Sequence, residues 1–161
     1  MGASYKPLPA AEELWELFSY NPLTGQLHCR KTGKIRGWRT RRGYRRVVVA
    51  HNKFLAHRLI WKWITGFEPR GCLDHIDGDG QNNRFLNLRQ ATHSQNSCNR
   101  GKDTSNTSGF KGVFRNRDRW TAKVMAQGTI HRLGTFDTPE EAHQAYCEAA
   151  RRLHREFAQV A

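Results

Sequence analysis

The sequence predicts an α+β fold of two modules, the second being a small three-stranded antiparallel sheet packed on one C-terminal helix. Short apolar runs of strand length recur between clusters of turn-forming residues, and apolar residues recur at helical spacing in only a few stretches. The segment 101–109 is almost wholly polar and turn-forming, as linkers often are. We therefore expect a first module at 1–100, a linker at 101–109 and a second module at 110–161.

In the first module, apolar patterns and turn formers predict each element. Val47-Val48-Val49 indicates a strand, and Gly66 is a suitable C-terminal stop for the helix before it. Thr92 and Gln95 have the spacing of a helix capping box. We expect helices at 10–18 and 56–65, strands at 26–30 and 44–50, turns at 21–25 and 51–53, and a strand, a long loop, a short strand and a helix within 72–99.

In the second module, three strands are followed by an amphipathic helix that begins at Thr138-Pro139-Glu140-Glu141. Side chains alternate between the two faces of a strand, so Lys123 and Arg132 should lie opposite Val124 and Leu133. The sheet would then turn a polar face away from the helix. The expected strands are 110–116, 120–126 and 130–136, with turns at 116–118 and 127–128 and with Thr135 on the same face as His131 and Leu133.

Positive charge dominates the composition. The chain has 27 Lys and Arg against 14 Asp and Glu, a formal net charge of +13 and a pI near 10.3. Such a surplus repels itself in a compact fold unless a polyanion neutralises it. Aromatic residues lie among the charges, as in Gly37-Trp38-Arg39 and Arg119-Trp120. This mixture is typical of a nucleic-acid partner.

Other classes of protein are disfavoured. No apolar stretch approaches the roughly 20 residues of a membrane span, and the N-terminus lacks a signal-peptide pattern. Cys29, Cys72, Cys98 and Cys147 lie far apart, without the paired spacing of a structural zinc site. We expect a cytoplasmic protein, in a bacterial host or phage-infected cell, with reduced thiols, no membrane partner and no small-molecule cofactor, and a monomer rather than an oligomer.

One region contains the groups that phosphodiester hydrolysis needs. Asp74-His75, Asn87 and Asn96 lie in the runs Asp-His-Ile-Asp-Gly-Asp, Asn-Leu-Arg and Gln-Asn, with Asn-Asn-Arg between the first two. An imidazole can take a proton from water near neutral pH. A divalent cation can neutralise charge on the phosphate, and Asp and Asn supply the oxygen ligands that hard cations prefer.

These motifs resemble the HNH family of nucleases, also called ββα-metal or His-Me finger enzymes. Their order is similar to that of the phage and intron-encoded homing endonucleases, and the match covers roughly residues 54–99. The resemblance implies a ββα-metal nuclease fold for the first module. It also implies an enzyme that hydrolyses phosphodiester bonds in double-stranded DNA with a single divalent metal ion.

The roles of individual residues follow from the same resemblance. It implies that His75 is the general base, that Asp74 and Asn96 ligate the metal, and that Asn87 holds the loop bearing His75 and orients the imidazole by a hydrogen bond. The family name HNH stands for His-Asn-His, and this chain departs from it because Asn96 takes the place of the second histidine. One branch of the homing enzymes has this His-Asn-Asn form, and its oxygen donors favour Mg²⁺ or Mn²⁺ over zinc.

Alternative interpretations stay open from sequence alone. Asp77-Gly78-Asp79-Gly80 is similar to a calcium loop, although the glutamate expected at its far end is absent. His57 fits a packed or capping histidine, and Asn87 and Asn96 could serve a turn and an exposed helix face. For the whole chain, the alternatives are a non-catalytic, sequence-specific DNA-binding regulator with a decayed nuclease domain and an RNA-binding protein.

The second module resembles the plant ethylene-response-factor DNA-binding domain. The runs Phe110-Lys111-Gly112-Val113, Trp120-Thr121-Ala122-Lys123-Val124 and Leu133-Gly134-Thr135-Phe136 carry the match, which spans about residues 108–158. In bacterial and phage proteins this domain often follows an HNH nuclease. The alternative is that its basic residues contact only phosphates, without reading sequence.

Two groups of residues are expected to contact DNA. In the first module, a basic stretch would hold the DNA backbone beside the active site. In the second, the resemblance implies contact positions of which Phe114 and Ile130 depart from the plant pattern, so the target sequence is not inherited. The expected DNA-binding residues are Arg39, Arg41, Arg42, Arg45 and Arg46 in the first module and Lys111, Arg115, Arg117, Arg119, Lys123 and Arg132 in the second.

Overall fold

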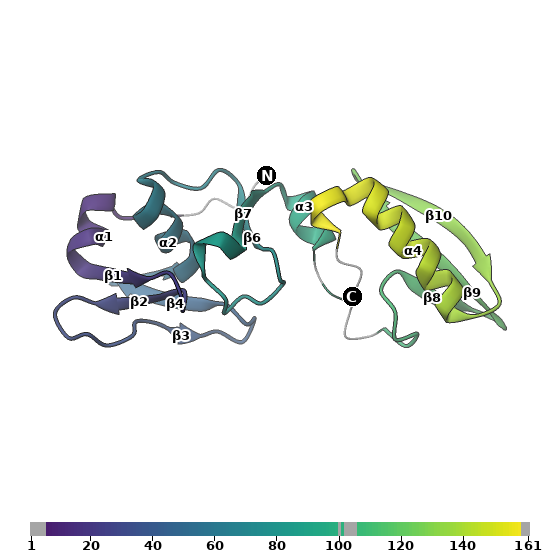
Figure 1. Cartoon of the computed structure of the whole chain (residues 1–161), viewed down its shortest axis with the longest axis horizontal. Coiled ribbons are helices and arrows are strands. Elements are labelled where there is room, and N and C mark those ends of the chain that lie inside the picture. The colour runs from purple at the N-terminus through teal and green to yellow at the C-terminus, as the bar shows by residue number, and fades with distance from the viewer. Residues whose placement is uncertain (1–5, 100, 102–105, 159–161) are drawn as a thin grey trace. The chain divides into compact units, whose positions relative to one another are not determined.

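The computed structural model describes residues 6–99, 101 and 106–158, coloured along the chain in Figure 1. They form two compact units, Met1–Gln90 and Ala91–Ala161. Both units combine helices with antiparallel strands, so the predicted α+β class is confirmed. Within the described ranges, no helix has the length and apolar character needed to cross a membrane.

The first unit packs two helices against small antiparallel sheets. β1 pairs with β2, β4 lies between β3 and β5, and β6 pairs with β7. Leu14, Leu27, Val47, Leu59 and Ile60 are almost completely buried and form the centre of its core. The elements are α1 (Ala11–Leu17), β1 (Phe18–Asn21), β2 (Gln26–Cys29), β3 (Trp38–Arg39), β4 (Arg45–Val49), β5 (Asn52–Leu55), α2 (Ala56–Thr65), β6 (Cys72–His75), a 3-10 turn η1 (Phe85–Asn87) and β7 (Leu88–Ala91).

Two local predictions in this unit were wrong. The sequence predicted a turn at 51–53, whereas Val49 pairs with Asn52 and the chain reverses at Ala50-His51, with φ of 44° and 64°. Two left-handed residues match the twist of a tight hairpin, but here they are not the usual Asn-Gly pair. The strand β1 was also missed, because it follows α1 without an intervening turn residue.

Helix α2 agrees with its prediction at both ends. It spans Ala56–Thr65 and stops at Gly66, whose φ of 77° is accessible to glycine at little cost. The Gly66 N–H donates to Lys62 O at 2.8 Å and closes the last turn. Leu59 and Ile60 anchor the helix in the core, which fixes the position of His57 in its first turn.

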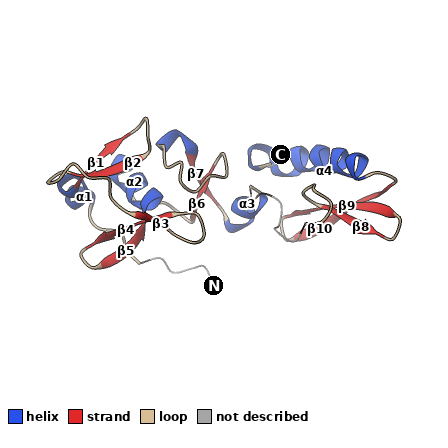
Figure 2. Cartoon of the chain, turned by 90° about the horizontal axis from the view of Figure 1, so that it is seen from below, coloured by secondary structure: helices blue, strands red, loops and turns tan. Residues whose placement is uncertain are grey.

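The second unit is a sheet of order β10-β9-β8 with α4 along one face, as Figure 2 shows. Val113, Ala122 and Val124 pack from the sheet against Ala142 and Tyr146 of the helix. Capping boxes at Thr92–Gln95 and Thr138–Glu141 start its two α-helices, as the sequence predicted. The elements are α3 (His93–Cys98), β8 (Val113–Asn116), β9 (Arg119–Ala126), β10 (Thr129–Phe136), α4 (Pro139–His154) and a 3-10 turn η2 (Arg155–Phe157).

A β-bulge in β10 corrects the predicted faces of this sheet. Arg132 pairs with Lys123, but the register shifts before Gly134, so that Thr135 pairs with Thr121. Residues of one cross-strand pair share a face. Thr135 therefore lies on the face opposite the helix, although strict alternation placed it with Leu133. An inserted residue reverses the alternation beyond it. Gly134, a glycine inside a strand, was the sequence signal for the bulge, and the prediction did not use it.

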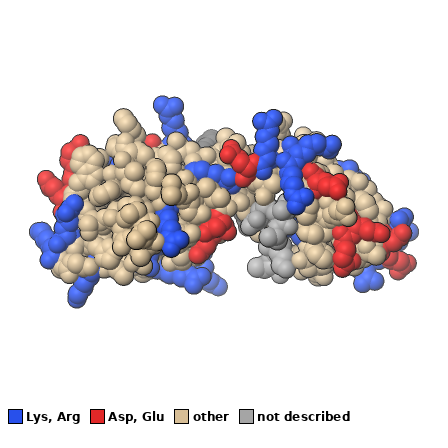
Figure 3. Space-filling model, viewed as in Figure 1, with Lys and Arg blue, Asp and Glu red and all other residues tan. Residues whose placement is uncertain are grey.

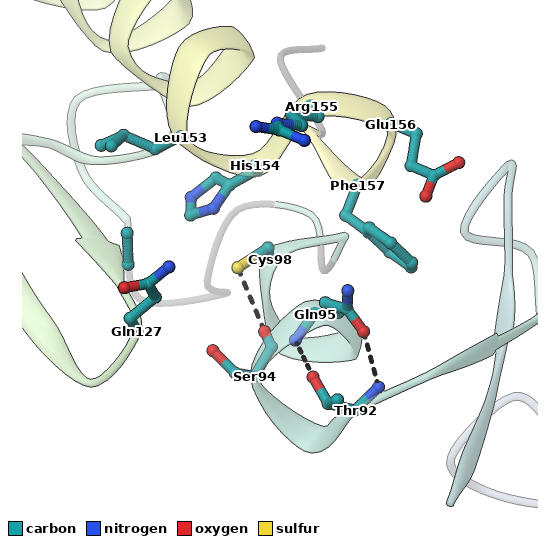
Figure 4. A pocket seen from close by; sticks show the side chains of 11 residues that line it. Thr92, Ser94, Gln95, Cys98, Gln127, Leu153, His154, Arg155, Glu156 and Phe157 are labelled. Carbon is teal, nitrogen blue, oxygen red and sulfur yellow. Dashed lines mark hydrogen bonds between the residues drawn. The ribbon is translucent and has the colours of Figure 1, made fainter. Parts of the chain in front are cut away.

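Helix α3 falls in the second unit. It lies against β9 and η2, and Figure 4 shows the pocket lined by α3 and by the chain around η2. The sequence instead assigned this helix to the first module, with a linker at 101–109. Residues 100 and 102–105, and with them the predicted division near 105, lie outside the described residues. The module boundaries stay a prediction.

Candidate active site

Strand β6 carries Asp74 and His75 at the end of its pairing with β7. All four of its residues are buried, and Asp74 and His75 are each 4% exposed. Just beyond, Ile76 N–H donates to Asn87 O at 2.9 Å, which joins the start of the following loop to its end. The strand therefore places a carboxylate and an imidazole at the start of a loop whose two ends are joined by a hydrogen bond.

The His75 ring is bonded to a buried asparagine. Its Nε2 lies 2.9 Å from Asn83 Oδ1, and Asn83 is 1% exposed. An amide oxygen can only accept, so this contact requires the proton on Nε2 and makes Nδ1 the basic nitrogen of the neutral ring. Asn83 thereby selects a tautomer of the proposed base.

The backbone of Asn83 is itself fixed by the hairpin of β1 and β2. The Tyr20 hydroxyl donates to Asn83 O at 3.2 Å and accepts from Phe85 N–H at 2.8 Å. Gly25, with φ of 70°, lies so close that a Cβ there would stand 2.6 Å from the Asn83 carbonyl carbon. The hairpin thus supports the ring partner of His75, which gives the β1–β2 sheet a role in the site.

Asn87 holds the loop. Its Oδ1 accepts from Asp77 N–H at 3.1 Å, while its Nδ2 donates to Asp77 Oδ1 at 2.9 Å and to Asn82 O at 2.8 Å. The sequence-based prediction also gave Asn87 a hydrogen bond to the imidazole. In the structure Asn83 makes that bond, and Asn87 contacts the loop around it.

The Asp77 carboxylate is occupied by loop donors. It accepts from Asn87, from Asn82 Nδ2 at 2.6 Å and from Asp79 N–H at 2.9 Å. Burial raises the pKa of Asp77, but these hydrogen bonds outweigh it and hold the pKa below its ordinary value. Both carboxylate oxygens serve the loop fold. This disfavours the calcium-loop alternative.

Asp74 is paired with an arginine. Arg89 Nε lies 2.8 Å from Asp74 Oδ2, and both side chains are largely buried. A buried carboxylate needs a compensating charge, and Arg89 of β7 provides one. The pair places a carboxylate beside His75 and binds its Oδ2 to Arg89.

The two metal ligands predicted from the sequence are of the types that a hard divalent ion prefers. Asp74 has a carboxylate and Asn96 an amide oxygen, which Mg²⁺ and Mn²⁺ accept. Among the described residues, no three or more His, Cys, Asp or Glu gather as a metal-binding group. A closed zinc site of the common kind therefore has no place in the described part of the chain.

Asn96 lies in α3 of the second unit. It is half-buried, its N–H donates to Thr92 O at 2.9 Å, and α3 begins at the Thr92–Gln95 capping box drawn in Figure 4. The structure brings Asp74, His75 and Asn87 together within the first unit. The fourth predicted site residue, Asn96, belongs to the other unit.

Two aromatic rings surround His75. His57 stands edge-on to it with ring centroids 5.0 Å apart, and Tyr44 lies 5.9 Å away. Gly80 permits the approach of Tyr44, because a Cβ there would stand 2.9 Å from the tyrosine ring. Burial, then His75 and Arg58, lower the pKa of His57 to about 3. His57 is a packed, neutral histidine, and its side chain does not cap the helix.

The basic residues of the first unit mostly face solvent. Arg39, Arg41, Arg42 and Arg46 are exposed, and Figure 3 shows Lys and Arg along the margin of this unit. Arg45 differs, because it is half-buried and its Nη1 donates to Gly37 O at 3.1 Å. Four of the five predicted DNA-binding arginines here are thus available to phosphates, while Arg45 bonds the backbone that leads into β3.

In the second unit, the residues predicted to bind DNA separate into two sets. Lys123 and Arg132 are paired across β9 and β10 on the face opposite α4. Arg119 shares the parity of Lys123 but binds Asp137 at 2.8 Å. The others lie elsewhere: Lys111 donates to Cys98 O at 2.7 Å, Arg115 lies over the Trp120 ring at 5.9 Å, and Arg117 occupies a turn.

Sequence reasoning did not assign Asn83, Arg89 or Tyr44 to this region, and it named His57 only as a packed or capping histidine. Asn83 and Arg89 lie inside the motif runs, so their presence there was the signal, but nothing in the spacing assigned them to His75 and Asp74. Tyr44 and His57 come from distant segments that only the fold brings to the imidazole.

Comparisons with known proteins bear on both modules. Residues 54–98 match the family model of the HNH endonucleases, and residues 108–156 match that of the AP2 domain. Protein 3.8 of Escherichia phage T7 is 35% identical over 121 residues, covering 73% of this chain and 97% of that protein. An uncharacterised HNH endonuclease, L560, of Acanthamoeba polyphaga mimivirus is 37% identical over 108 residues, covering 66% of this chain and 56% of its own length.

A solved structure also matches the chain. It describes DNA binding and cleavage by the HNH homing endonuclease I-HmuI, with a TM-score of 0.41, 20% identity and coverage of 86% of this chain and 85% of that one. The chain belongs to the HNH endonucleases, and in it a nuclease module is followed by an AP2 domain.

Proposed function

We propose that the chain is a metal-dependent endonuclease that hydrolyses phosphodiester bonds in double-stranded DNA, with His75 as the general base and a single divalent metal ion. The observation that carries the proposal is the buried Asp74-His75 pair, with Arg89 on the carboxylate and Asn83 on the imidazole. Each side chain of the pair has a hydrogen-bonding partner that fixes its position.

The proton transfer follows from the His75–Asn83 contact. With Nε2 committed to Asn83 Oδ1, the ring would take the proton of the attacking water at Nδ1. The edge-on His57 ring limits rotation of the imidazole from one side. The loop closed by Asn87 limits movement of the backbone after His75. A base held in a fixed position at the end of a strand is suited to deprotonate the water molecule that attacks the phosphodiester.

Asp74 and Asn96 would hold the metal ion, Mg²⁺ or Mn²⁺, which when bound supplies charge neutralisation at the phosphate. Arg89 fixes one oxygen of Asp74 by a hydrogen bond. The proposal for Asn96 rests on its place in the motif order. It requires Asn96 to belong to the nuclease module, as in the sequence-based division that assigns residues 1–100 to that module.

The remaining basic residues would bind the DNA. In the first unit, backbone phosphates would be bound by the exposed residues Arg39, Arg41, Arg42 and Arg46. In the second unit, base edges in a DNA groove would be contacted by Lys123 and Arg132, which lie on the sheet face opposite α4. Arg45, Lys111 and Arg115 have structural contacts and are weaker candidates. Because relatives occur in a phage and a virus, we also propose that the enzyme acts in the cytoplasm of an infected cell.

The test is cleavage of supercoiled plasmid by the full chain. With Mg²⁺ or Mn²⁺ the plasmid should be nicked or linearised, and EDTA should stop the reaction. Asp74→Ala and Asn96→Ala should each raise the metal concentration needed for half-maximal rate, while a half-buried control outside the motif, Asn52→Ala, should not. Tight, salt-sensitive DNA binding without cleavage by the wild type in either metal would favour the non-catalytic regulator instead.

A further inference from the structure

The open face of the second unit's sheet carries large apolar side chains. Phe114, Met125 and Ile130 are 51%, 60% and 57% exposed. The strand register places them on one face: Phe114 pairs with Thr121, Met125 pairs with Ile130, and Thr121 and Met125 have the same parity in β9. Ala122 and Val124 have the opposite parity and are buried with α4. These three apolar residues therefore point away from the helix.

Basic residues interrupt the apolar ones on the same face. The Lys123–Arg132 pair lies between the Phe114 row and the Met125–Ile130 row, and Lys123 Nζ is 5.4 Å from the centroid of the Phe114 ring. Phe114, Thr121, Lys123, Arg132 and Thr135 contribute to a single concavity. The three strands contain no Asp or Glu, whereas α4 carries Glu140, Glu141 and Glu148 as well as Arg151 and Arg152. The open face is thus suited to a polyanion.

Cations on this face account for attraction to phosphate, but they do not account for the exposed apolar side chains. In the major groove of duplex DNA, hydrogen-bonding atoms line the base edges, and the one apolar group is the C5-methyl of thymine. The two apolar rows are four residues apart along β9, which is about 13 Å of strand. They can therefore reach different base pairs of one site.

We propose that Phe114, Met125 and Ile130 recognise thymine methyl groups in the major groove, so that the target of the chain is specified by thymines at positions these side chains cover. This inference rests on the proposed function, because it requires the open face of the sheet to bind duplex DNA. It deepens that function by naming the chemical feature of the substrate that is read.

The experiment begins with selection of bound sites from a random duplex library by the full chain in EDTA, which prevents cleavage. The selected duplex is then compared with versions in which deoxyuridine replaces thymidine, one position at a time. This change removes the methyl group and keeps every hydrogen-bonding group and the base pairing. Each contacted thymine should lose about fourfold in affinity, the worth of burying one methyl group.

Variants assign the loss to residues. Phe114→Ala should abolish discrimination between thymine and uracil at one set of positions, and Ile130→Ala or Met125→Ala at another. Phe67→Ala is the matched control, because Phe67 is 77% exposed in the first unit. It should keep full discrimination. Thermal unfolding of each variant shows whether the sheet is intact.

The outcomes separate the two claims. Equal affinity of the wild type for thymine and uracil duplexes overturns the inference and leaves the nuclease proposal standing. Discrimination that survives in all three alanine variants also overturns it, because other residues then read the methyl groups. If the wild type binds no duplex in low salt, the DNA-binding role proposed for the second unit is wrong as well.

Discussion

The Nε2 atom of His75 and the Oδ1 atom of Asn83 lie 2.9 Å apart, and both side chains are buried. His75 comes from the end of β6, and Asn83 comes from the far side of the loop that β6 enters. The contact links the proposed base to the β1–β2 hairpin, since Tyr20 and Gly25 hold the Asn83 backbone. The orientation of the imidazole thus depends on residues well outside the motif.

The first prediction concerns this contact. Asn83→Leu should lower the cleavage rate by about 10–100-fold, the usual effect of removing a group that orients a site residue. DNA affinity should change little, because Asn83 is buried and does not face the substrate. Asn83→Asp keeps an oxygen acceptor and should retain more activity than Asn83→Leu. Equal rates for Asn83→Leu and wild type would show that the bond does not orient the base.

The second prediction concerns the loop. Asn87→Ala removes three hydrogen bonds to Asp77 and Asn82, so that the loop after His75 loses its closure. Cleavage should fall by about 10–1,000-fold, and hydrogen exchange should speed up in residues 76–87. Asn87→Asp restores the acceptor but sets a carboxylate against Asp77, so it should not rescue activity. Unchanged exchange in Asn87→Ala would contradict the assigned role.

The third prediction concerns pH. The pKa of His57 falls from its ordinary value to about 3 in the folded protein, because the ring is buried next to His75 and Arg58. Protonation therefore favours the unfolded chain. The stability that His57 contributes is complete above about pH 6.5 and is lost as pH falls, with about 2 kcal/mol gone at pH 5.

Denaturant unfolding of wild type and His57→Leu at pH 5, 6, 7 and 8 measures this effect. The free energy of unfolding of the wild type should fall more steeply toward pH 5 than that of His57→Leu. Parallel curves for the two proteins would mean that His57 is not held neutral by the fold.

The fourth prediction concerns the second unit. A Cβ at Gly112, where φ is 72°, would stand 2.2 Å from the Tyr146 ring. Gly128 has a similar φ of 79° but open space around it. Gly112→Ala should therefore destabilise the unit by about 1–3 kcal/mol more than Gly128→Ala, since only the first adds a clash to the backbone strain. Equal melting temperatures for the two variants would contradict this packing.

The sequence predicted much of the fold because its signals are local. The capping boxes at Thr92 and Thr138, the stop at Gly66 and the apolar run at 47–49 each specify an element through neighbouring residues. The turn predicted at 51–53 lies at Ala50-His51 instead, and neither of these residues is typical of a tight turn. The bulge before Gly134 was not predicted, although a glycine inside a strand can mark one. Tertiary packing decides both.

The site was also predicted only in part. Asp74, His75 and Asn87 stand in a motif, and the structure brings them together. The partners Asn83 and Arg89 lie in the motif too, but pairing them with His75 and Asp74 requires the β6–β7 sheet and the loop. His57 and Tyr44 come from other elements, so no local pattern could join them to the site.

The central claim is that His75 acts as the general base. The most direct measurement is the single-turnover rate of DNA cleavage by wild type and His75→Ala at saturating Mg²⁺, with DNA affinity measured in parallel in EDTA. We predict a loss of about 10²–10⁴-fold in rate with affinity essentially unchanged. Cleavage at equal rates by the two proteins would contradict the claim.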